Sequence, residues 1–189
     1  MRLKGVYQHN SKDCGVACLL SIVEYYGGKN DFENIRYLTK CDTNGISALN
    51  IVNAASKLGF TARGIKCDLD NIKELCIPLI CHVTLNNGYN HYIIIKKIDK
   101  NYVYVFDPDK GHERYRVDKF KEIWNGIVIE LIPYRKLDAV ENKIPNLLKN
   151  IFSRNKYLYF MIVILCFISI ILAIVNNFYF KILLESKNL

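Results

Sequence analysis

Residues 157–180 form an uncharged apolar run, YLYFMIVILCFISIILAIVNNFYF, near the C-terminal end of the chain. An α-helix rises about 1.5 Å per residue, so the run is long enough to cross the roughly 30 Å hydrocarbon core of a bilayer. The alternative is a buried helix of a soluble protein, but such a helix is rarely apolar on every face. The sequence therefore predicts a transmembrane helix at 157–180.

The residues around this run predict which side of the membrane holds the rest of the chain. The first residues, MRLKGVYQHNSKDCG, lack the apolar segment of a secretory signal peptide, so we do not expect the N-terminal part to be exported. Lys149, Arg154 and Lys156 closely precede the run, whereas only Lys181 and Lys187 follow it. Under the positive-inside rule, this bias places the N-terminal domain in the cytoplasm.

The basic character of the chain does not indicate nucleic-acid binding. The formal net charge is +8, of which residues 1–135 carry +4 and the much shorter segment 136–189 carries the other +4. Positive charge is thus densest around the membrane run, where an anionic lipid surface attracts it. We therefore expect a membrane partner and no nucleic-acid partner.

Seven cysteines are present, and no two of them form a CxxC pair. In the cytoplasm they should be reduced, so disulfides and zinc-ribbon sites are not expected. One alternative remains, a partial metal site formed by Cys76, Cys81 and His82. Cys81 alternates with Leu79 and Val83, however, which favours packing as a small apolar side chain. The sequence predicts no metal site.

Apolar periodicity divides residues 1–135 into a helical part and a strand-rich part. Helices are expected after the N-caps Asp13, Asp31 and Ser47. After Gly59, short apolar runs between turn signals indicate strands at 60–66, 77–85, 91–98, 102–108 and 126–133, with short helical turns at 70–75 and 118–124. The expected fold class is α+β, a helical half followed by an antiparallel sheet.

Residues 136–156 are expected to connect this domain to the membrane run. Their apolar side chains recur at helical spacing on one face: Ile144, Leu147, Leu148, Ile151 and Phe152. This pattern indicates an amphipathic helix at the membrane surface or, alternatively, a helix packed on the soluble domain. The predicted organisation is a domain at 1–135, a connecting segment at 136–156 and a membrane helix at 157–180.

The stretch QHNSKDCGVACL, residues 8–19, has the features of a nucleophile site. Cys14 would lie in the first turn of a helix, where free N–H groups and the helix dipole favour the thiolate. Gly15 would leave the approach to the sulfur open. Gln8, on the segment leading into the helix, could donate its amide to an oxyanion beside the backbone N–H of Cys14.

A cysteine nucleophile needs a histidine base that a third group orients. Among His9, His82, His91 and His112, the best candidate is His91, because residues 91–108 read as a β-hairpin that ends near Asp107. If facing residues have numbers that sum to 198 or 200, His91 and Asp107 share one face of adjacent strands. An odd sum would place them on opposite faces.

Each of these residues has a plainer explanation when taken alone. A cysteine at a helix start is commonly structural, and a histidine on a strand is commonly just a hydrogen-bonded polar residue. Together, Gln8, Cys14, His91 and Asp107 supply an oxyanion donor, a nucleophile, a base and its orienting carboxylate. His82 is the second candidate for the base, although no carboxylate follows it at a suitable distance.

At this level of detail the sequence resembles a known family. QHNSKDCGVACL, YYGG, GISALNIVNAASKLGF, NHYIIIKKI, VYVFDPDKG and FKEIWNGIVIEL are similar to the bacteriocin-processing cysteine peptidase domain of peptidase-containing ABC transporters. The resemblance covers about residues 5–133, and the membrane run matches the start of the transporter's membrane domain. It implies a papain-like fold with Cys14 as nucleophile, His91 as base, Asp107 as orienting group and Gln8 as oxyanion donor.

The resemblance also implies a substrate and a cellular setting. The substrate would be a leader peptide cleaved after a double glycine, and cleavage would be coupled to export of the released bacteriocin or similar peptide. The peptidase would need no cofactor and would face the cytoplasm from a bacterial cell membrane. The full-length transporter would cross the membrane several times, act as a homodimer and use ATP and Mg²⁺ in its nucleotide-binding domain.

The chain contains no GxxxxGK[ST] phosphate-binding loop, so the sequence is either a fragment or a truncated product of such a transporter.

The sequence leaves two alternative functions open. A leader-docking domain without peptidase activity is one alternative function, which the presence of Cys14 disfavours. A deubiquitinase-like or transglutaminase-like enzyme of the same broad fold is the other, which the membrane run disfavours.

Overall fold

A computed structural model describes residues 3–85, 88–137 and 156–187 of the chain. The chain divides into two compact units, Met1–Glu141 and Asn142–Leu189. The amphipathic helix expected within 136–156 lies outside the described residues. The boundaries predicted at 135 and 156 therefore stay predictions.

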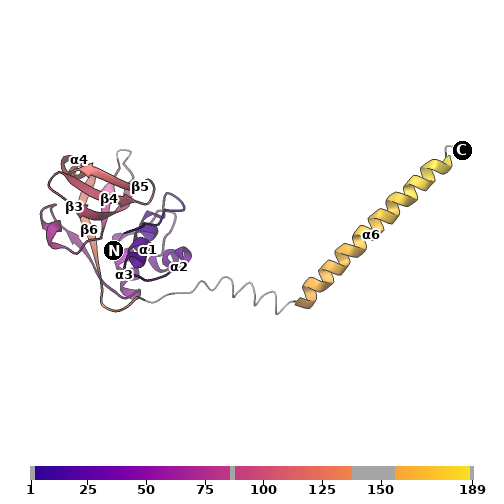
Figure 1. The fold of residues 1–189 in the computed structure, drawn as a ribbon, viewed down its shortest axis with the longest axis horizontal. Helices are drawn as coiled ribbons and strands as arrows, with labels where there is room; N and C mark the ends of the chain where they lie inside the picture. The colour runs from indigo at the N-terminus through magenta and orange to yellow at the C-terminus, as the bar shows by residue number, and fades with distance from the viewer. Residues whose placement is uncertain (1–2, 86–87, 138–155, 188–189) are drawn as a thin grey trace. The chain divides into compact units, whose positions relative to one another are not determined.

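The helical half of the first unit contains three helices, and the apolar helix α1 contacts the other two (Figure 1). They are α1 (Cys14–Tyr25), α2 (Phe32–Thr39) and α3 (Ala48–Lys57). Every residue of α1 from Cys14 to Val23 is buried, which explains why its sequence lacks a polar face. The predicted cap of α3 is present, because the Ser47 side chain accepts a hydrogen bond from the backbone N–H of Asn50 at 3.2 Å.

The second half of the unit is one six-stranded, fully antiparallel sheet in the order β1-β6-β2-β3-β4-β5. The strands are β1 (Phe60–Lys66), β2 (Leu79–Thr84), β3 (Asn90–Ile98), β4 (Tyr102–Asp107), β5 (Gly111–Arg116) and β6 (Trp124–Pro133). The turns η1 (Asn71–Glu74) and α4 (Val117–Ile123) match the two predicted short helical turns. The expected α+β class with an antiparallel sheet is thus confirmed.

The strand β5 was not predicted from the sequence. Its residues GHERYR carry charges and only one large apolar side chain, so they lack the β-branched alternation of the other strands. An edge strand needs only one neighbour, and charged side chains on an edge protect it from pairing with other chains. Backbone pairing with β4, from Tyr102↔Arg116 to Asp107↔Gly111, therefore forms this strand where side-chain pattern does not indicate it.

Two apolar clusters lie on the two faces of the sheet. Along β3, Ile94 belongs to the cluster shared with α1, whereas Ile93 and Ile95 belong to the cluster that includes Phe120 of α4. Cys81 lies fully buried in this second cluster, which confirms its predicted role as a small core side chain. Apolar side chains therefore cover both faces of the middle of β3.

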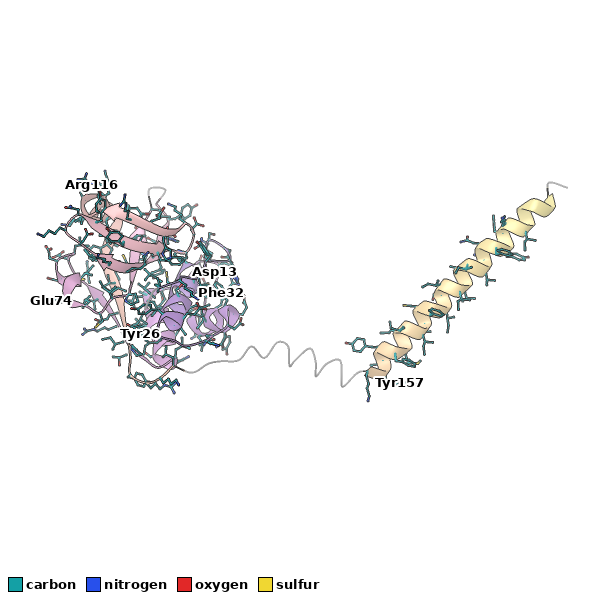
Figure 2. The ribbon with its side chains drawn as sticks, in the orientation of Figure 1. Asp13, Tyr26, Phe32, Glu74, Arg116 and Tyr157 are labelled. Carbon is teal, nitrogen blue, oxygen red and sulfur yellow. The ribbon has the colours of Figure 1, made fainter. Side chains whose placement is uncertain are left out.

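The second unit contains one long helix, α6 (Lys156–Lys187), and its side chains project outward on all sides (Figure 2). Its segment Lys156–Ile182 has a mean hydropathy of 3.1 over its most apolar window, with none of that window buried. Among the described residues, α6 alone is long and apolar enough to cross a membrane. It contains the whole run 157–180 that the sequence predicted as helical.

Candidate active site

Cys14 is the first residue of α1, as predicted, and is 7% exposed. The residue before it does not act as predicted, because the Asp13 side chain makes no capping hydrogen bond. Instead, its fully buried Oδ1 accepts a hydrogen bond from the guanidinium of Arg36 at 2.6 Å. A buried carboxylate needs a charged partner, and the partner on α2 ties the start of α1 to its neighbouring helix.

Gly15 lies at a closely packed position in the first turn of α1. A Cβ at this position would lie 3.1 Å from Cδ1 of Ile51, 3.3 Å from Cδ1 of Ile46 and 3.4 Å from Cδ2 of Tyr92. These distances are tighter than ordinary contacts. Gly15 therefore lets the first turn of α1 pack closely against α3 and β3, while its expected effect on access to the sulfur stays a prediction.

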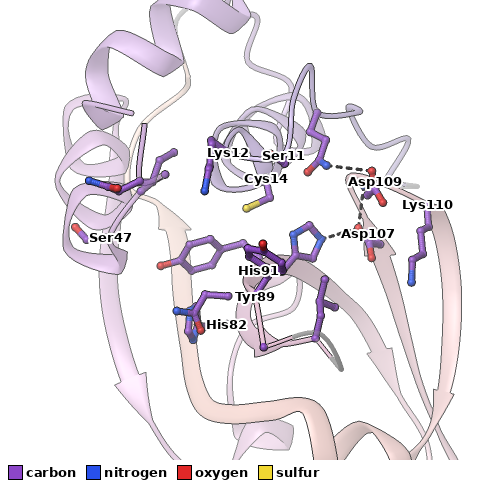
Figure 3. Close-up of a pocket in the computed structure, with 18 residues that line it drawn as sticks. Ser11, Lys12, Cys14, Ser47, His82, Tyr89, His91, Asp107, Asp109 and Lys110 are labelled. Carbon is purple, nitrogen blue, oxygen red and sulfur yellow. Dashed lines mark hydrogen bonds and ion pairs between the residues drawn. The ribbon is translucent and has the colours of Figure 1, made fainter. Parts of the chain in front are cut away.

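His91 and Asp107 meet at the end of the sheet that faces Cys14. His91 lies at the start of β3 and Asp107 at the end of β4, and the His91 Nε2 to Asp107 Oδ1 distance is 2.8 Å. Both side chains are buried, with 7% and 2% of their surface exposed. Figure 3 shows Cys14, His91 and Asp107 in a row across the site.

A register shift in the hairpin brings these two residues to one face. Next to the turn, Ile98 faces Val103, so the numbers of facing residues sum to 201. If this pairing continued without interruption, His91 and Asp107 would lie on opposite faces of the sheet. The register shifts between Ile95 and Lys97, and beyond this bulge Ile94 faces Phe106, a sum of 200. A sum of 200 is one of the two values for which the sequence predicted that His91 and Asp107 share one face of the sheet.

Hydrogen bonding keeps His91 positively charged. Burial disfavours the imidazolium, but the hydrogen bonds to Asp107 and Cys14 and the charges of both outweigh it, raising the pKa of His91 from 6.5 to about 9. Since Nε2 bonds Asp107, the contact with Cys14 is left to Nδ1. Burial also works against ionisation of Asp107, yet the hydrogen bonds from His91 and from the Asp109 backbone N–H hold its pKa below 3.8.

Gln8 reaches the site from the segment that leads into α1. Its backbone N–H donates to the carbonyl of Pro108 at 3.0 Å, and its side-chain Nε2 donates to Oδ1 of Asp109 at 3.1 Å. Its Oε1 is buried and has no hydrogen-bond partner. The structure thus brings all four residues that the sequence singled out to one place.

The four residues line one cavity of about 830 Å³. Residues that sequence reasoning did not assign to the site also line it, from the α2–α3 loop, the β2–β3 loop and the turn after β4: Asn44, Gly45, Ile46, Ser47, Leu85, Tyr89, Asp109 and Lys110. Of these residues, the sequence indicated Ser47 as a cap and placed Tyr89, Asp109 and Lys110 in the turn signals NNGYN and DPDKG, with no role in the site. Nothing local indicates that this loop lies beside Cys14.

The alternatives to these residues have other partners. His82 lines the cavity, but its Nδ1 lies 2.7 Å from Nδ2 of Asn125, and burial with a smaller contribution from His91 lowers its pKa. Cys18 is buried, with its Sγ 3.4 Å from the carbonyl oxygen of Tyr92. Across the described parts of the chain there is no cluster of three or more His, Cys, Asp or Glu side chains that could hold a metal.

Comparison with known proteins assigns this arrangement to a family. Residues 2–136 match the sequence profile of the peptidase C39 family. The chain belongs to the peptidase C39 family. The papain-like cysteine peptidase resemblance seen in the sequence motifs is thereby confirmed for most of the chain.

Curated relatives in this family are processing and transport proteins. The chain is 29% identical over 192 residues to the lactococcin-G-processing and transport ATP-binding protein LagD of Lactococcus lactis, covering 97% of this chain and 25% of that protein. It is 32% identical over 130 residues to the transport/processing ATP-binding protein ComA of Streptococcus pneumoniae, covering 67% and 18%. The chain spans about a quarter or less of the length of these C39-containing relatives.

Solved C39 structures share the fold of the first unit. The peptidase domain of Streptococcus ComA superimposes with a TM-score of 0.66 at 34% identity, covering 70% of this chain and 99% of that one. A double glycine motif protease from an AMS/PCAT transporter, solved in complex with its leader peptide, has a TM-score of 0.64 at 27% identity, covering 70% and 94%. The match therefore extends over nearly the whole of each of these two solved chains.

Proposed function

We propose that the first unit is a cysteine peptidase that cleaves a leader peptide after a double glycine. The main observation is the buried row of Cys14, His91 and Asp107 along one cavity, in which His91 is hydrogen-bonded to Asp107. Membership of the C39 family and similarity to processing proteins support the same conclusion. The four catalytic assignments made from the sequence are kept as part of this proposal.

Cys14 supplies the nucleophile. Its sulfur lies in the first turn of α1, in the same cavity as His91, which takes the thiol proton as the sulfur attacks. The thiolate attacks the carbonyl carbon of the second glycine, and the carbonyl electron pair moves to oxygen. The backbone N–H of Cys14 and the side-chain amide of Gln8 stabilise this oxyanion.

His91 moves the protons in both halves of the reaction. When the tetrahedral intermediate collapses, His91 gives its proton to the leaving amine, and a thioester remains on Cys14. The neutral His91 then takes a proton from water, whose oxygen attacks the thioester and releases the leader. Asp107 keeps the ring oriented and stabilises its positive charge.

Glycine residues suit the position of the sulfur. Cys14 is almost fully covered, and the first turn of α1 packs closely on Ile46, Ile51 and Tyr92. A substrate backbone must approach this turn closely to bring its carbonyl to the sulfur. We propose that side chains next to the scissile bond would be excluded, whereas glycine allows the approach.

The relatives and α6 support a transporter setting for this peptidase. We assign the chain to the N-terminal part of a longer, multi-pass ABC transporter that acts as a homodimer, with α6 crossing a bacterial cell membrane. The peptidase would face the cytoplasm and need no cofactor, while ATP and Mg²⁺ would bind a nucleotide-binding domain elsewhere in the protein. No nucleic acid is proposed as a partner.

A cleavage assay tests this function. The full chain, in detergent micelles with reductant, is incubated with a synthetic leader peptide ending in Gly-Gly plus several following residues, and products are identified by mass spectrometry. We expect cleavage after the second glycine, none with Cys14→Ala or His91→Ala, and normal cleavage with the matched variant Cys76→Ala, which alters an exposed thiol. Leader binding without cleavage by the wild type would instead assign a docking function.

A further inference from the structure

A second histidine, His82, lines the cavity and has no role in the proposed mechanism. It lies on β2, where it pairs with Tyr92 of β3, and its neighbour Val83 pairs with His91. Because β3 lies between β2 and β4, His82 and Asp107 flank His91 from opposite sides (Figure 3). The wall of the cavity on the β2 side therefore carries a titratable group that the reaction does not use.

A chain of hydrogen bonds fixes which ring nitrogen of His82 carries the proton. Nδ2 of Asn125 lies 2.7 Å from Nδ1 of His82 and also donates to Oγ1 of Thr84 at 3.0 Å. The Thr84 hydroxyl donates in turn to Oδ1 of Asn90 at 3.3 Å. An amide nitrogen donates hydrogen bonds and does not accept them, so Nδ1 of His82 is the acceptor. In the neutral ring the proton is then on Nε2.

The surroundings of His82 keep this ring neutral. Burial and, to a smaller extent, the charge of His91 lower the pKa of His82 from 6.5. Among the described residues, no carboxylate pairs with His82, in contrast to His91, which pairs with Asp107. With Nδ1 occupied and Nε2 protonated, the neutral ring has no lone pair left to act as a base. It can only donate a hydrogen bond.

The donor atom of His82 is accessible from the cavity. Asn125, which occupies Nδ1, does not line the cavity, whereas His82 does. Nε2 has no hydrogen-bond partner among the residues that the structure describes. Within the same residues, the buried side-chain nitrogen and oxygen atoms without a partner are Oε1 of Gln8 and Oδ2 of Asp13. Nε2 is not one of them, so its N–H is open to a group that enters the cavity.

We propose that His82 binds the leader peptide by donating a hydrogen bond from Nε2 to a backbone carbonyl oxygen next to the scissile bond. This inference rests on the proposed function, in which the cavity holds the double glycine. Glycine has no side chain to recognise, so the polar groups that an enzyme can bind there are those of the backbone. The cleavage mechanism assigns no proton transfer to His82. The hydrogen bond should therefore set the affinity for the leader rather than the rate of the chemical step.

The first test is leader cleavage by the full chain in micelles. We expect His82→Ala to raise KM about fivefold with kcat changed less than twofold, since one neutral hydrogen bond has about this effect. His82→Gln, whose amide nitrogen reaches about as far as Nε2, should keep KM within twofold of the wild type. The matched control is His112→Ala, a histidine outside this cavity, which should change neither constant. An equal loss in His82→Gln and His82→Ala would indicate a packing role and overturn the inference.

The second test finds the carbonyl that His82 binds. Each leader in a series carries one thioamide in place of a peptide bond near the scissile bond, because sulfur accepts hydrogen bonds more weakly than oxygen. We expect one member of the series to raise KM about threefold with the wild type and to have no such effect with His82→Ala. If every thioamide affects the two proteins equally, His82 does not bind a backbone carbonyl and the inference is wrong.

A binding measurement separates the inference from the proposed function. A fluorescently labelled leader is titrated into Cys14→Ala, and the Kd from fluorescence anisotropy should rise about fivefold when His82→Ala is added. If the wild type cleaves the leader and His82→Ala changes neither KM nor Kd, the inference is wrong and the function stands. If the leader binds through His82 as expected but the wild type cleaves nothing, the function is wrong and the binding role holds. If the leader is neither cleaved nor bound, both are overturned.

Discussion

Helices α1 and α6 are both apolar around almost their whole circumference, yet their surroundings differ completely. In α1, residues Cys14 to Val23 are buried beneath α2, α3 and the sheet, whereas the Lys156–Ile182 segment of α6 is exposed along its length. The 12 residues of α1 span about 18 Å, too short for a bilayer, while the 32 residues of α6 exceed its thickness. An apolar circumference therefore indicates only that the helix must be shielded from water. The length of the helix decides whether a lipid bilayer can provide this shielding or whether packed protein must do so.

The largest expected difference between the two helices is chemical. Helix α1 begins with Cys14, and α6 contains Cys166. We expect Cys14→Ala to reduce leader cleavage by about 10⁴-fold or more, because the nucleophile is lost. The same change at Cys166 should leave the rate within twofold. The cleavage rates of both variants are measured by mass spectrometry. Activity near the wild-type level in Cys14→Ala would show that Cys14 is not the nucleophile.

A second expected difference concerns stability. Leu19 of α1 is fully buried, whereas Leu165 of α6 is 57% exposed. Leu19→Ala should lower the free energy of unfolding of the first unit by about 2–5 kcal/mol, because it leaves a cavity. Leu165→Ala should change that free energy by less than about 0.5 kcal/mol. The single tryptophan, Trp124 in β6, reports unfolding of this unit in urea. Equal changes in the free energy of unfolding for the two variants would contradict the difference in burial between Leu19 and Leu165.

A third difference concerns membrane insertion. Ile168 lies near the middle of the candidate span and Ile182 at its end. Lysine at the centre of a membrane helix costs about 2.5–3.5 kcal/mol of insertion free energy, whereas near the end its amine reaches the interface. We expect Ile168→Lys to weaken co-flotation with liposomes clearly and Ile182→Lys to weaken it little. If both variants float like the wild type, α6 does not span the bilayer.

The smallest expected difference is the response to pH. The pKa of His91 is raised from 6.5 to about 9, so its interactions stabilise the folded state fully below pH 6.5. This contribution should be lost as the pH rises from 6.5 through 9, and cleavage should fall near pH 9 as the leaving group loses its proton donor. Liposome association through α6 should not change over this range.

The control for this pH response is His91→Gln. The urea midpoint of the wild type should fall between pH 6.5 and 9 more steeply than that of His91→Gln, which has no proton to lose at this position. Parallel curves for the two proteins would show that the pH dependence comes from groups other than His91.

Much of the fold could be read from local sequence. Asp31 and Ser47 stand at the N-cap positions of α2 and α3 as predicted, although only Ser47 makes a capping hydrogen bond, and Gly27 follows the end of α1. Five of the strands follow apolar runs. The strand β5 was missed because its pattern is that of a charged edge, and pairing with β4 forms it.

The site was harder to read, and the corrections have a common cause. Asp13 has the spacing of a cap but pairs with Arg36, 23 positions away. Gly15 lies beside Cys14 in sequence, and the side chains packed closely around it, Ile51 and Tyr92, are distant in the sequence. The catalytic roles of Gln8, Cys14, His91 and Asp107 stay predictions until cleavage is measured.

By itself, the sequence determined the features that depend on near neighbours and on length. These are the helix that begins at Cys14, the strands that carry His91 and Asp107, and an apolar helix long enough for a bilayer. Their physical origins, hydrogen bonds within one helical turn, side-chain alternation and bilayer thickness, act over a few residues or on composition alone.

The tertiary structure alone decided how these parts meet. A one-residue bulge at Lys96 changes the hairpin sum from odd to even and so brings His91 and Asp107 to one face. The contact between Gln8 and Asp109 joins residues 101 positions apart. No local pattern encodes such features, because a single inserted residue or a distant contact changes which side chains meet without changing the propensity of either segment.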